Sequence, residues 1–170
     1  MVSINDQLTL MDEIQILTFT LDDVLYGVNV NQVREVKHFE GITRIPYAPD
    51  YIKGVTNIRG EIVPVIDLRK RFGLTIKEDD DVTNILIIVH GTRPVGIMVD
   101  SVLEVLTIPQ KNIQADSDSL IVDNSQVVLG IAKFEKDLFV LLDFMKVVAK
   151  DDLNVDVASI QLETQNELIS

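Results

Sequence analysis

The chain has 170 residues, of which 46% are hydrophobic, and its 27 acidic and 15 basic side chains give a formal net charge of −12. These values exclude wholesale disorder and argue against a nucleic-acid or anionic-membrane surface, which would need clustered Lys and Arg. With no cysteine, no Lys or Arg before Arg34 to mark a signal peptide, and apolar runs far below the roughly 18 residues of a membrane helix, we expect a soluble, cytoplasmic protein.

Apolar alternation and β-branched residues predict an all-β chain. Strands are expected near residues 14–20, 52–58, 61–67, 84–89, 95–100 and 137–142, the run at 84–89 being apolar enough for burial on both faces. Between the second and third of these, Arg59-Gly60 predicts a hairpin turn. Short helices are expected at 29–36 and 144–150.

The charges are unevenly spread along the chain. Residues 34–71 carry eight bases against five acids, which makes this the one segment where a partner of opposite charge could dock. Residues 1–13 and 151–170 contain acids and no bases, so we expect flexible or loosely packed ends. Truncation after Lys150 should therefore leave the fold intact.

Two collinear blocks of the chain resemble each other. At an offset of 69, residues 27–36 match residues 96–105 with five of ten identities. At an offset of 76, Gly54 falls on Gly130 and residues 61–68 fall on 137–144, so the second copy carries an insertion that we place within 110–126. Chance alignment of apolar residues is the alternative, but the shared glycines and acids favour an internal duplication. We expect one domain over 14–148, made of two similar β-units at about 14–80 and 82–148 that share an apolar seam.

Nothing in the sequence recommends catalysis. His38 and His90 stand alone, the acidic run at 78–81 lacks the spacing and glycine of a calcium loop, and no phosphate-binding glycine motif or nucleophile elbow occurs. We predict no catalytic residue, no metal site and no cofactor. The alternative from a different class is a hydrolase that uses Asp and Glu residues in the loops of the β-units.

Differences between the copies point to function more clearly. Asp67 and Asp143 occupy matching positions, which indicates a shared structural role such as a cap. The turn Arg59-Gly60, in contrast, is matched by Glu135-Lys136. A solvated turn residue is the simple interpretation of Arg59. Because the segment 54–60 is otherwise apolar or small, we expect Arg59 to project from a mostly apolar patch, as an interface anchor does. Glu35 is matched by Glu104, and spacing alone would make it a structural acid.

The segment Tyr47-Ala48-Pro49-Asp50-Tyr51-Ile52-Lys53-Gly54-Val55-Thr56-Asn57-Ile58-Arg59-Gly60-Glu61-Ile62-Val63-Pro64-Val65-Ile66-Asp67-Leu68-Arg69 closely resembles the signature of the bacterial chemotaxis coupling family, CheW. Supporting stretches are 26–28, 33–36, 96–102 and 130–131, so the resemblance covers about residues 14–148. It implies two five-stranded SH3-like β-barrel subdomains packed around a shared core, with short helices.

The same resemblance implies a non-enzymatic adaptor. Its partners would be the cytoplasmic tip of a chemoreceptor (a methyl-accepting chemotaxis protein) and the regulatory domain of the histidine kinase CheA, with recruitment to membrane receptor arrays. It implies that Arg59 and Glu35 face the receptor, with Val33, Gly54 and Val102 near the same groove. Kinase contacts are not assigned to residues, although the loop 110–126 is suspected. We predict that Arg59 and Glu35 lie close enough to interact.

Overall fold

The structure, a computed structural model, describes residues 12–75, 83–115 and 127–148. Of the expected ends at 1–13 and 151–170, all but residues 12 and 13 lie outside the described residues, as does most of the insertion expected within 110–126, and Glu13 begins the first strand. The elements in chain order are β1 (Glu13–Leu21), β2 (Val24–Asn29), η1 (Val30–Gln32), β3 (Glu35–His38), β4 (Ile52–Ile58), β5 (Glu61–Asp67), α2 (Leu68–Arg71), β6 (Asn84–His90), β7 (Arg93–Val99), β8 (Ser101–Pro109), η2 (Gln110–Asn112), β9 (Ile113–Ala115), β10 (Val128–Phe134), β11 (Asp137–Leu142) and α3 (Phe144–Val147).

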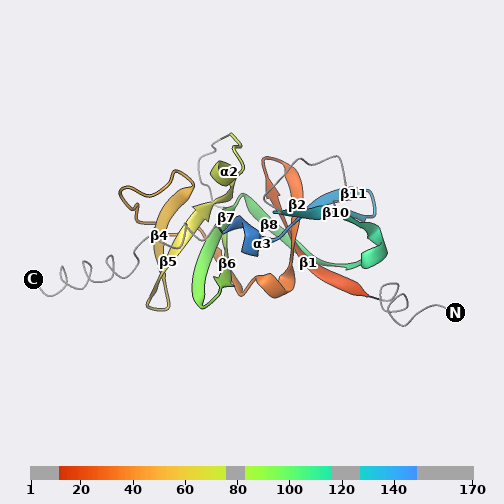
Figure 1. The fold of residues 1–170 in the computed structure, drawn as a ribbon, viewed down its shortest axis with the longest axis horizontal. Helices are drawn as coiled ribbons and strands as arrows, with labels where there is room; N and C mark the ends of the chain where they lie inside the picture. Colours follow the sequence, from red (N-terminus) through yellow and green to blue (C-terminus); the bar gives the residue numbers. More distant parts are fainter. Residues whose placement is uncertain (1–11, 76–82, 116–126, 149–170) are drawn as a thin grey trace, which may run out of the picture.

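The strands form two sheets, which lie at opposite ends of the long axis with α3 between them (Figure 1). The five-stranded sheet has the order β3-β6-β7-β5-β4, and the six-stranded sheet has the order β8-β1-β2-β11-β10-β9. Each sheet therefore combines strands from both halves of the chain. The first two strands of each half, β1 with β2 and β6 with β7, pair within the sheet completed by the other half.

The internal repeat reappears in the strand register. Gly96 of β7 pairs in parallel with Val65 of β5, and Gly27 of β2 pairs in parallel with Leu141 of β11. These two pairs are related by the offsets of 69 and 76 found in the sequence. The sixth strand β9 has only an isolated bridge between Thr43 and Val55 as its counterpart in the described part of the five-stranded sheet.

Close packing explains why both copies carry a glycine at this position. A Cβ atom on Gly96 would lie 2.8 Å from Ile85 Cγ2, and one on Gly27 would lie 2.8 Å from Ile16 Cδ1. Real Cβ atoms do not approach neighbours so closely in a well-packed interior. The shared glycines therefore serve the scaffold in both sheets.

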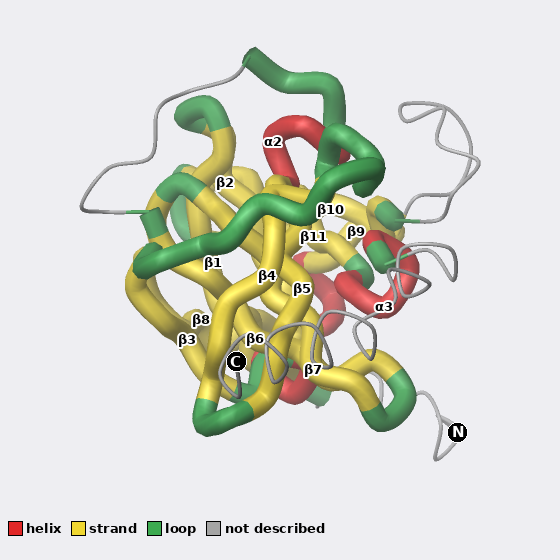
Figure 2. Tube along the Cα trace, turned by 90° about the vertical axis from the view of Figure 1, so that its left-hand side faces the viewer, coloured by secondary structure: helices red, strands yellow, loops and turns green. Residues whose placement is uncertain are grey.

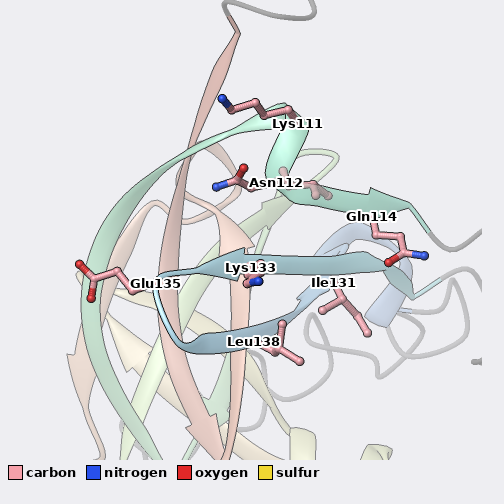
Figure 3. A pocket seen from close by; sticks show the side chains of 8 residues that line it. Lys111, Asn112, Gln114, Ile131, Lys133, Glu135 and Leu138 are labelled. Atoms are coloured by element: carbon pink, nitrogen blue, oxygen red, sulfur yellow. The ribbon is translucent and has the colours of Figure 1, made fainter.

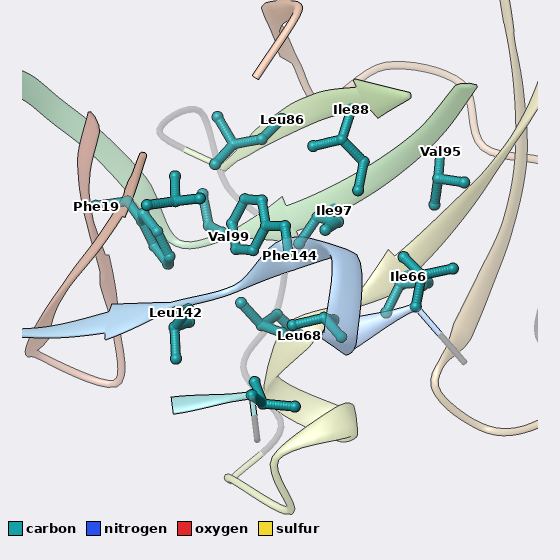
Figure 4. Close-up of a cluster of buried hydrophobic side chains, with 14 of the residues drawn as sticks. Phe19, Ile66, Leu68, Leu86, Ile88, Val95, Ile97, Val99, Leu142 and Phe144 are labelled. Atoms are coloured by element: carbon teal, nitrogen blue, oxygen red, sulfur yellow. The ribbon is translucent and has the colours of Figure 1, made fainter. Parts of the chain in front are cut away.

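The core has three parts, and the largest is shared. This central cluster contains Phe19 and Leu142 from the six-stranded sheet, Ile97 from the five-stranded sheet, and Leu68 and Phe144 from the two helices (Figure 4). Two smaller clusters each lie within one sheet. The expected all-β architecture around a shared core is confirmed.

Strand β6 shows how one sequence serves two of these clusters. Its residues 85 and 87 face the small cluster of the five-stranded sheet, whereas residues 86 and 88 face the central cluster, and all four are buried. Because successive side chains of a strand point to opposite faces, a continuous apolar run supplies both. The predicted burial on both faces is confirmed.

The sequence patterns placed some elements correctly and one wrongly. The strands at 52–58, 61–67 and 137–142 are confirmed. The helix expected at 29–36 is wrong, because only Val30–Gln32 form a 3-10 turn and Glu35–His38 form β3. Pairing of β3 with β6, extended by the Arg34 N–H that donates to the Ile87 carbonyl at 2.7 Å, draws this segment into the sheet.

The two matching aspartates cap short helices, as expected. The Asp67 carboxylate accepts from the backbone N–H of Arg69 at 3.1 Å and begins α2, and Asp143 accepts from the N–H of Met145 at 3.0 Å and begins α3. Of the helix expected at 144–150, residues 144–147 are helical.

Candidate functional site

Arg59 is the first residue of a tight hairpin turn. Ile58 and Glu61 form the last pair between β4 and β5, so Arg59 and Gly60 alone make the turn, and Figure 2 shows this hairpin in front of the other strands. Both turn residues have positive φ, 53° and 84°, which suits glycine and is tolerated by Arg59. The Gly60 N–H donates to Asn57 Oδ1 at 2.9 Å and fixes the turn.

The Arg59 guanidinium pairs with Glu35. Its Nη2 atom lies 2.9 Å from Glu35 Oε2, which confirms the prediction that the two side chains interact. Glu35 begins β3 and Arg59 follows β4, and these strands are the opposite edges of the five-stranded sheet. An ion pair between the edges shows that this sheet curls on itself.

The two partners of this pair differ in exposure. The Glu35 side chain is 17% exposed, and its Oε1 atom is buried without a hydrogen-bond partner among the described residues. The Arg59 side chain is 74% exposed. A pair this exposed contributes about 0–1 kcal/mol to folding stability, so the fold does not depend on it. The guanidinium has five N–H donors, and those not used by Glu35 can contact a partner.

The six-stranded sheet cannot form an equivalent pair at the matching positions. These are Glu104 and Glu135, two acids that are both exposed. The turn geometry is nevertheless the same, because Glu135 has φ of 54° and lies in the two-residue turn between β10 and β11. The scaffold thus requires the turn and does not require the arginine, which supports a specialised role for Arg59.

The expected site residues fall into different environments. Val33 and Val102, which match under the repeat, are half-buried and both pack against the central cluster. Gly54 is buried in β4 at a bulge, and a Cβ atom there would collide with the Thr43 carbonyl and lie 2.7 Å from Ile42 Cγ2. The structure therefore brings Glu35 and Arg59 into contact. Val33 and Val102 both contact the central cluster, and Gly54 lies beneath the Thr43 backbone.

One expectation about Arg59 is wrong. Its segment was expected to form a mostly apolar patch from which the arginine projects, but Val55 and Ile58 are buried. The apolar side chains of a half-buried hairpin turn toward the core, and Asn57, Arg59 and Gly60 remain exposed.

A groove lies on the six-stranded sheet, beside η2, β9, β10 and β11 (Figure 3). Its volume is about 690 Å³, and its lining combines two lysines, one glutamate and two amides with three apolar side chains: Lys111, Asn112, Ile113, Gln114, Ile131, Lys133, Glu135 and Leu138. Leu138 is 60% exposed. The described part of the suspected loop 110–126 forms one wall of this groove.

Two further polar contacts were not foreseen from the sequence. The buried Arg69 of α2 pairs with Asp100 between β7 and β8, and Gln32 bonds to the start of α3. Each contact joins residues far apart in the chain, so no local pattern in the sequence marked them.

Other chemistry is sparse in the described residues. Within 12–75, 83–115 and 127–148, no group of three His, Cys, Asp or Glu side chains could hold a metal ion. Across the same ranges, no helix has the length and apolar character needed to cross a membrane. Burial raises the pKa of the Tyr26 phenol, and the nearby Asp22 carboxylate raises it further.

Comparisons with known proteins agree on one family. The family model described as CheW-like domain matches residues 15–152. "Chemotaxis protein CheW" of Klebsiella aerogenes is 33% identical over 139 residues, which cover 82% of this chain and 84% of that protein. The Bacillus subtilis protein of the same name is 33% identical over 137 residues, covering 81% of this chain and 88% of that protein.

A solved structure gives the same result. The crystal structure of the scaffolding protein TtCheW from Thermoanaerobacter tengcongensis superposes with a TM-score of 0.76 at 32% sequence identity. The match covers 83% of this chain and 96% of that one.

Proposed function

The chain belongs to the CheW-like domain family, and from this premise we propose that it is a chemotaxis adaptor. It couples the cytoplasmic tips of chemoreceptors to the regulatory domain of the histidine kinase CheA. The observation that carries the proposal to particular residues is the exposed Arg59, held by Glu35 in one sheet and absent from the matching turn of the other.

In this proposal Arg59 contacts the receptor and Glu35 orients it. The ion pair fixes one nitrogen of the guanidinium and leaves its other donors toward solvent. Arginines at the centre of interfaces often cost about 2 kcal/mol or more when they are truncated. The pair thus contributes little to stability and much to recognition.

In the same proposal Val33 and Val102 supply apolar contact area for the receptor. Both remain half-buried at the margin of the central cluster, which lies between the two sheets. Gly54 supports the site by letting the Thr43 backbone cross β4 closely, so it shapes the hairpin that carries Arg59.

An adaptor needs a second surface for the kinase, and we assign it to the groove on the six-stranded sheet. Lys111 and Lys133 provide positive charge there, while Ile131 and Leu138 provide apolar area (Figure 3). The groove belongs to the other sheet from the Arg59 turn, so the two partners could bind at the same time.

The adaptor acts without catalysis or a cofactor, in the cytoplasm at membrane receptor arrays. The family match supports this over the hydrolase alternative.

Co-sedimentation tests the proposal. Membranes bearing a chemoreceptor from the same genome are mixed with its CheA, with and without the full 170-residue chain. We expect CheA to sediment in proportion to the added chain and to stay in the supernatant with membranes that lack the receptor. Sedimentation of CheA that is indifferent to the chain would contradict the proposal, as would turnover of generic ester, glycoside or phosphate substrates by the purified chain.

A further inference from the structure

The chain passes between the two sheets beside the proposed receptor surface. The turn η1 leaves the end of β2 in the six-stranded sheet, and β3 then joins the five-stranded sheet. Val33 and Glu35 follow this turn directly. Whatever fixes η1 therefore influences where these two side chains lie.

The side chain of Gln32, the last residue of η1, is anchored to α3. Its Nε2 donates to Asp143 Oδ1 at 3.0 Å, and its Oε1 accepts from the backbone N–H of Phe144 at 2.9 Å. Asp143 Oδ1 also accepts from the Met145 N–H at 3.0 Å as the cap of α3. One amide thus satisfies a donor and an acceptor at the start of the helix, and it joins two distant parts of the chain.

This anchor is not a requirement of the repeated scaffold. The residue that matches Gln32 in the second copy is Ser101, whose hydroxyl lies 2.6 Å from Thr20 Oγ1 within the sheet. The cap that matches Asp143 is Asp67, which bonds to its own helix N–H groups. The copy that carries the Arg59–Glu35 pair is thus also the one whose crossing turn is held by a glutamine.

We propose that Gln32 is a positioning residue for the receptor-binding segment Val33 to Glu35. The inference rests on the proposed receptor function of Arg59 and Glu35. By tying η1 to α3, the Gln32 amide fixes the entry of β3, so that Val33 packs on the central cluster and Glu35 meets Arg59. Gln32 itself is not assigned a contact with the receptor.

The chemistry of the amide suggests the test. In Gln32→Glu the new carboxylate can still accept from the Phe144 N–H, but it cannot donate to Asp143 and faces another negative charge. Adding Asp143→Asn removes this second negative charge, and the amide oxygen of the introduced side chain still caps Met145. Asparagine caps helices as well as aspartate does, so Asp143→Asn alone should be nearly neutral.

The experiment measures affinities of the full-length variants for two probes: a soluble fragment of a chemoreceptor tip from the same genome, and the regulatory domain of its CheA. We expect Gln32→Glu to weaken receptor binding about tenfold, the loss that one unsatisfied polar group produces, with kinase binding unchanged. The double variant, in which two negative charges no longer face each other, should recover part of that loss. Asn31→Asp, which adds the same charge at an exposed neighbouring position, should bind both probes like the wild type.

Comparing Gln32→Glu with Arg59→Glu separates the role of Gln32 from the receptor function itself. If the wild type binds the receptor fragment and Arg59→Glu does not, while Gln32→Glu binds like the wild type, Gln32 does not position the site. An equal loss of both probes in Gln32→Glu, or no recovery in the double variant, would also overturn the inference. If the wild type itself does not bind the fragment, the receptor function is wrong and the inference falls with it.

Discussion

Gly54→Ala separates a structural role of Gly54 from a direct contact with a partner. In the structure Gly54 has φ of +152°, and the Thr43 backbone crosses directly over it. A methyl group there would meet the Thr43 carbonyl and would lie 2.7 Å from Ile42 Cγ2. To make room, the Thr43 segment must move away from β4. This movement breaks the two backbone hydrogen bonds between Thr43 and Val55, which measure 2.8 and 2.9 Å.

The expected loss follows from these parts. Each lost backbone hydrogen bond costs about 0.5–1.5 kcal/mol, overpacking about 1–3 kcal/mol, and an alanine in a glycine conformation about 1 kcal/mol. We therefore expect Gly54→Ala to lower the free energy of unfolding by about 3–7 kcal/mol, a decrease in melting temperature of roughly 6–28 °C.

Gly91→Ala is the matched control. Gly91 also has positive φ, 66°, but nothing lies within 4 Å of the position of its Cβ. Its loss should be limited to about 1 kcal/mol from backbone conformation. Thermal unfolding of both variants, followed by circular dichroism, measures the difference. Gly54→Ala could instead have the same melting temperature as Gly91→Ala and yet lose receptor binding. That result would contradict the structural role of Gly54 and would show that Gly54 contacts the partner itself.

Three further predictions concern stability. Arg69→Met should lower the free energy of unfolding by about 3–5 kcal/mol in urea titration, because it leaves the buried Asp100 carboxylate without its cation; wild-type stability would contradict this. Asp67→Ala should lower the free energy of unfolding by about 1 kcal/mol because the α2 cap is lost, whereas Asp67→Asn should lower it much less. Equal losses in the two variants would refute the capping role. Because the folded pKa of Tyr26 is raised, the unfolded chain loses its phenol proton first, and stability should fall as pH rises above about 10. Tyr26→Phe should lose less stability over that range, and an identical alkaline profile would contradict the assignment.

Local patterns in the sequence predicted the parts of the fold that local chemistry determines. The strands at 52–58 and 61–67 are rich in β-branched residues and have a clear turn between them, and their bounds match β4 and β5. Strand β8 was missed because only Asp100 separates it from β7, with no glycine or proline to mark the boundary. The segment at 29–36 was misassigned because its pairing with β6 is a tertiary effect that propensity does not contain.

The exchange of strands between the halves could not be read from the sequence. A repeat shows that two segments are alike, but not whether each strand pairs within its own copy or with the other. The site shows the same limit. The mismatch at Arg59 marked it as specialised, and the family resemblance added Glu35, whereas the link from Gln32 to Asp143 spans the chain and left no local signal.

The central claim is that Arg59 recognises the receptor directly and is not merely half of an ion pair. The measurement that tests it most directly is receptor-fragment affinity of the charge-swapped variant Glu35→Arg/Arg59→Glu, compared with Arg59→Glu and with Glu135→Arg in the matching turn of the other sheet. The swap restores the ion pair, so the melting temperature and CheA binding should stay near those of the wild type. We predict that receptor binding is still lost in the swapped variant and retained in Glu135→Arg. Wild-type receptor affinity of the swapped variant would show that the pair acts only through the structure, and would contradict the assignment of Arg59 to the receptor surface.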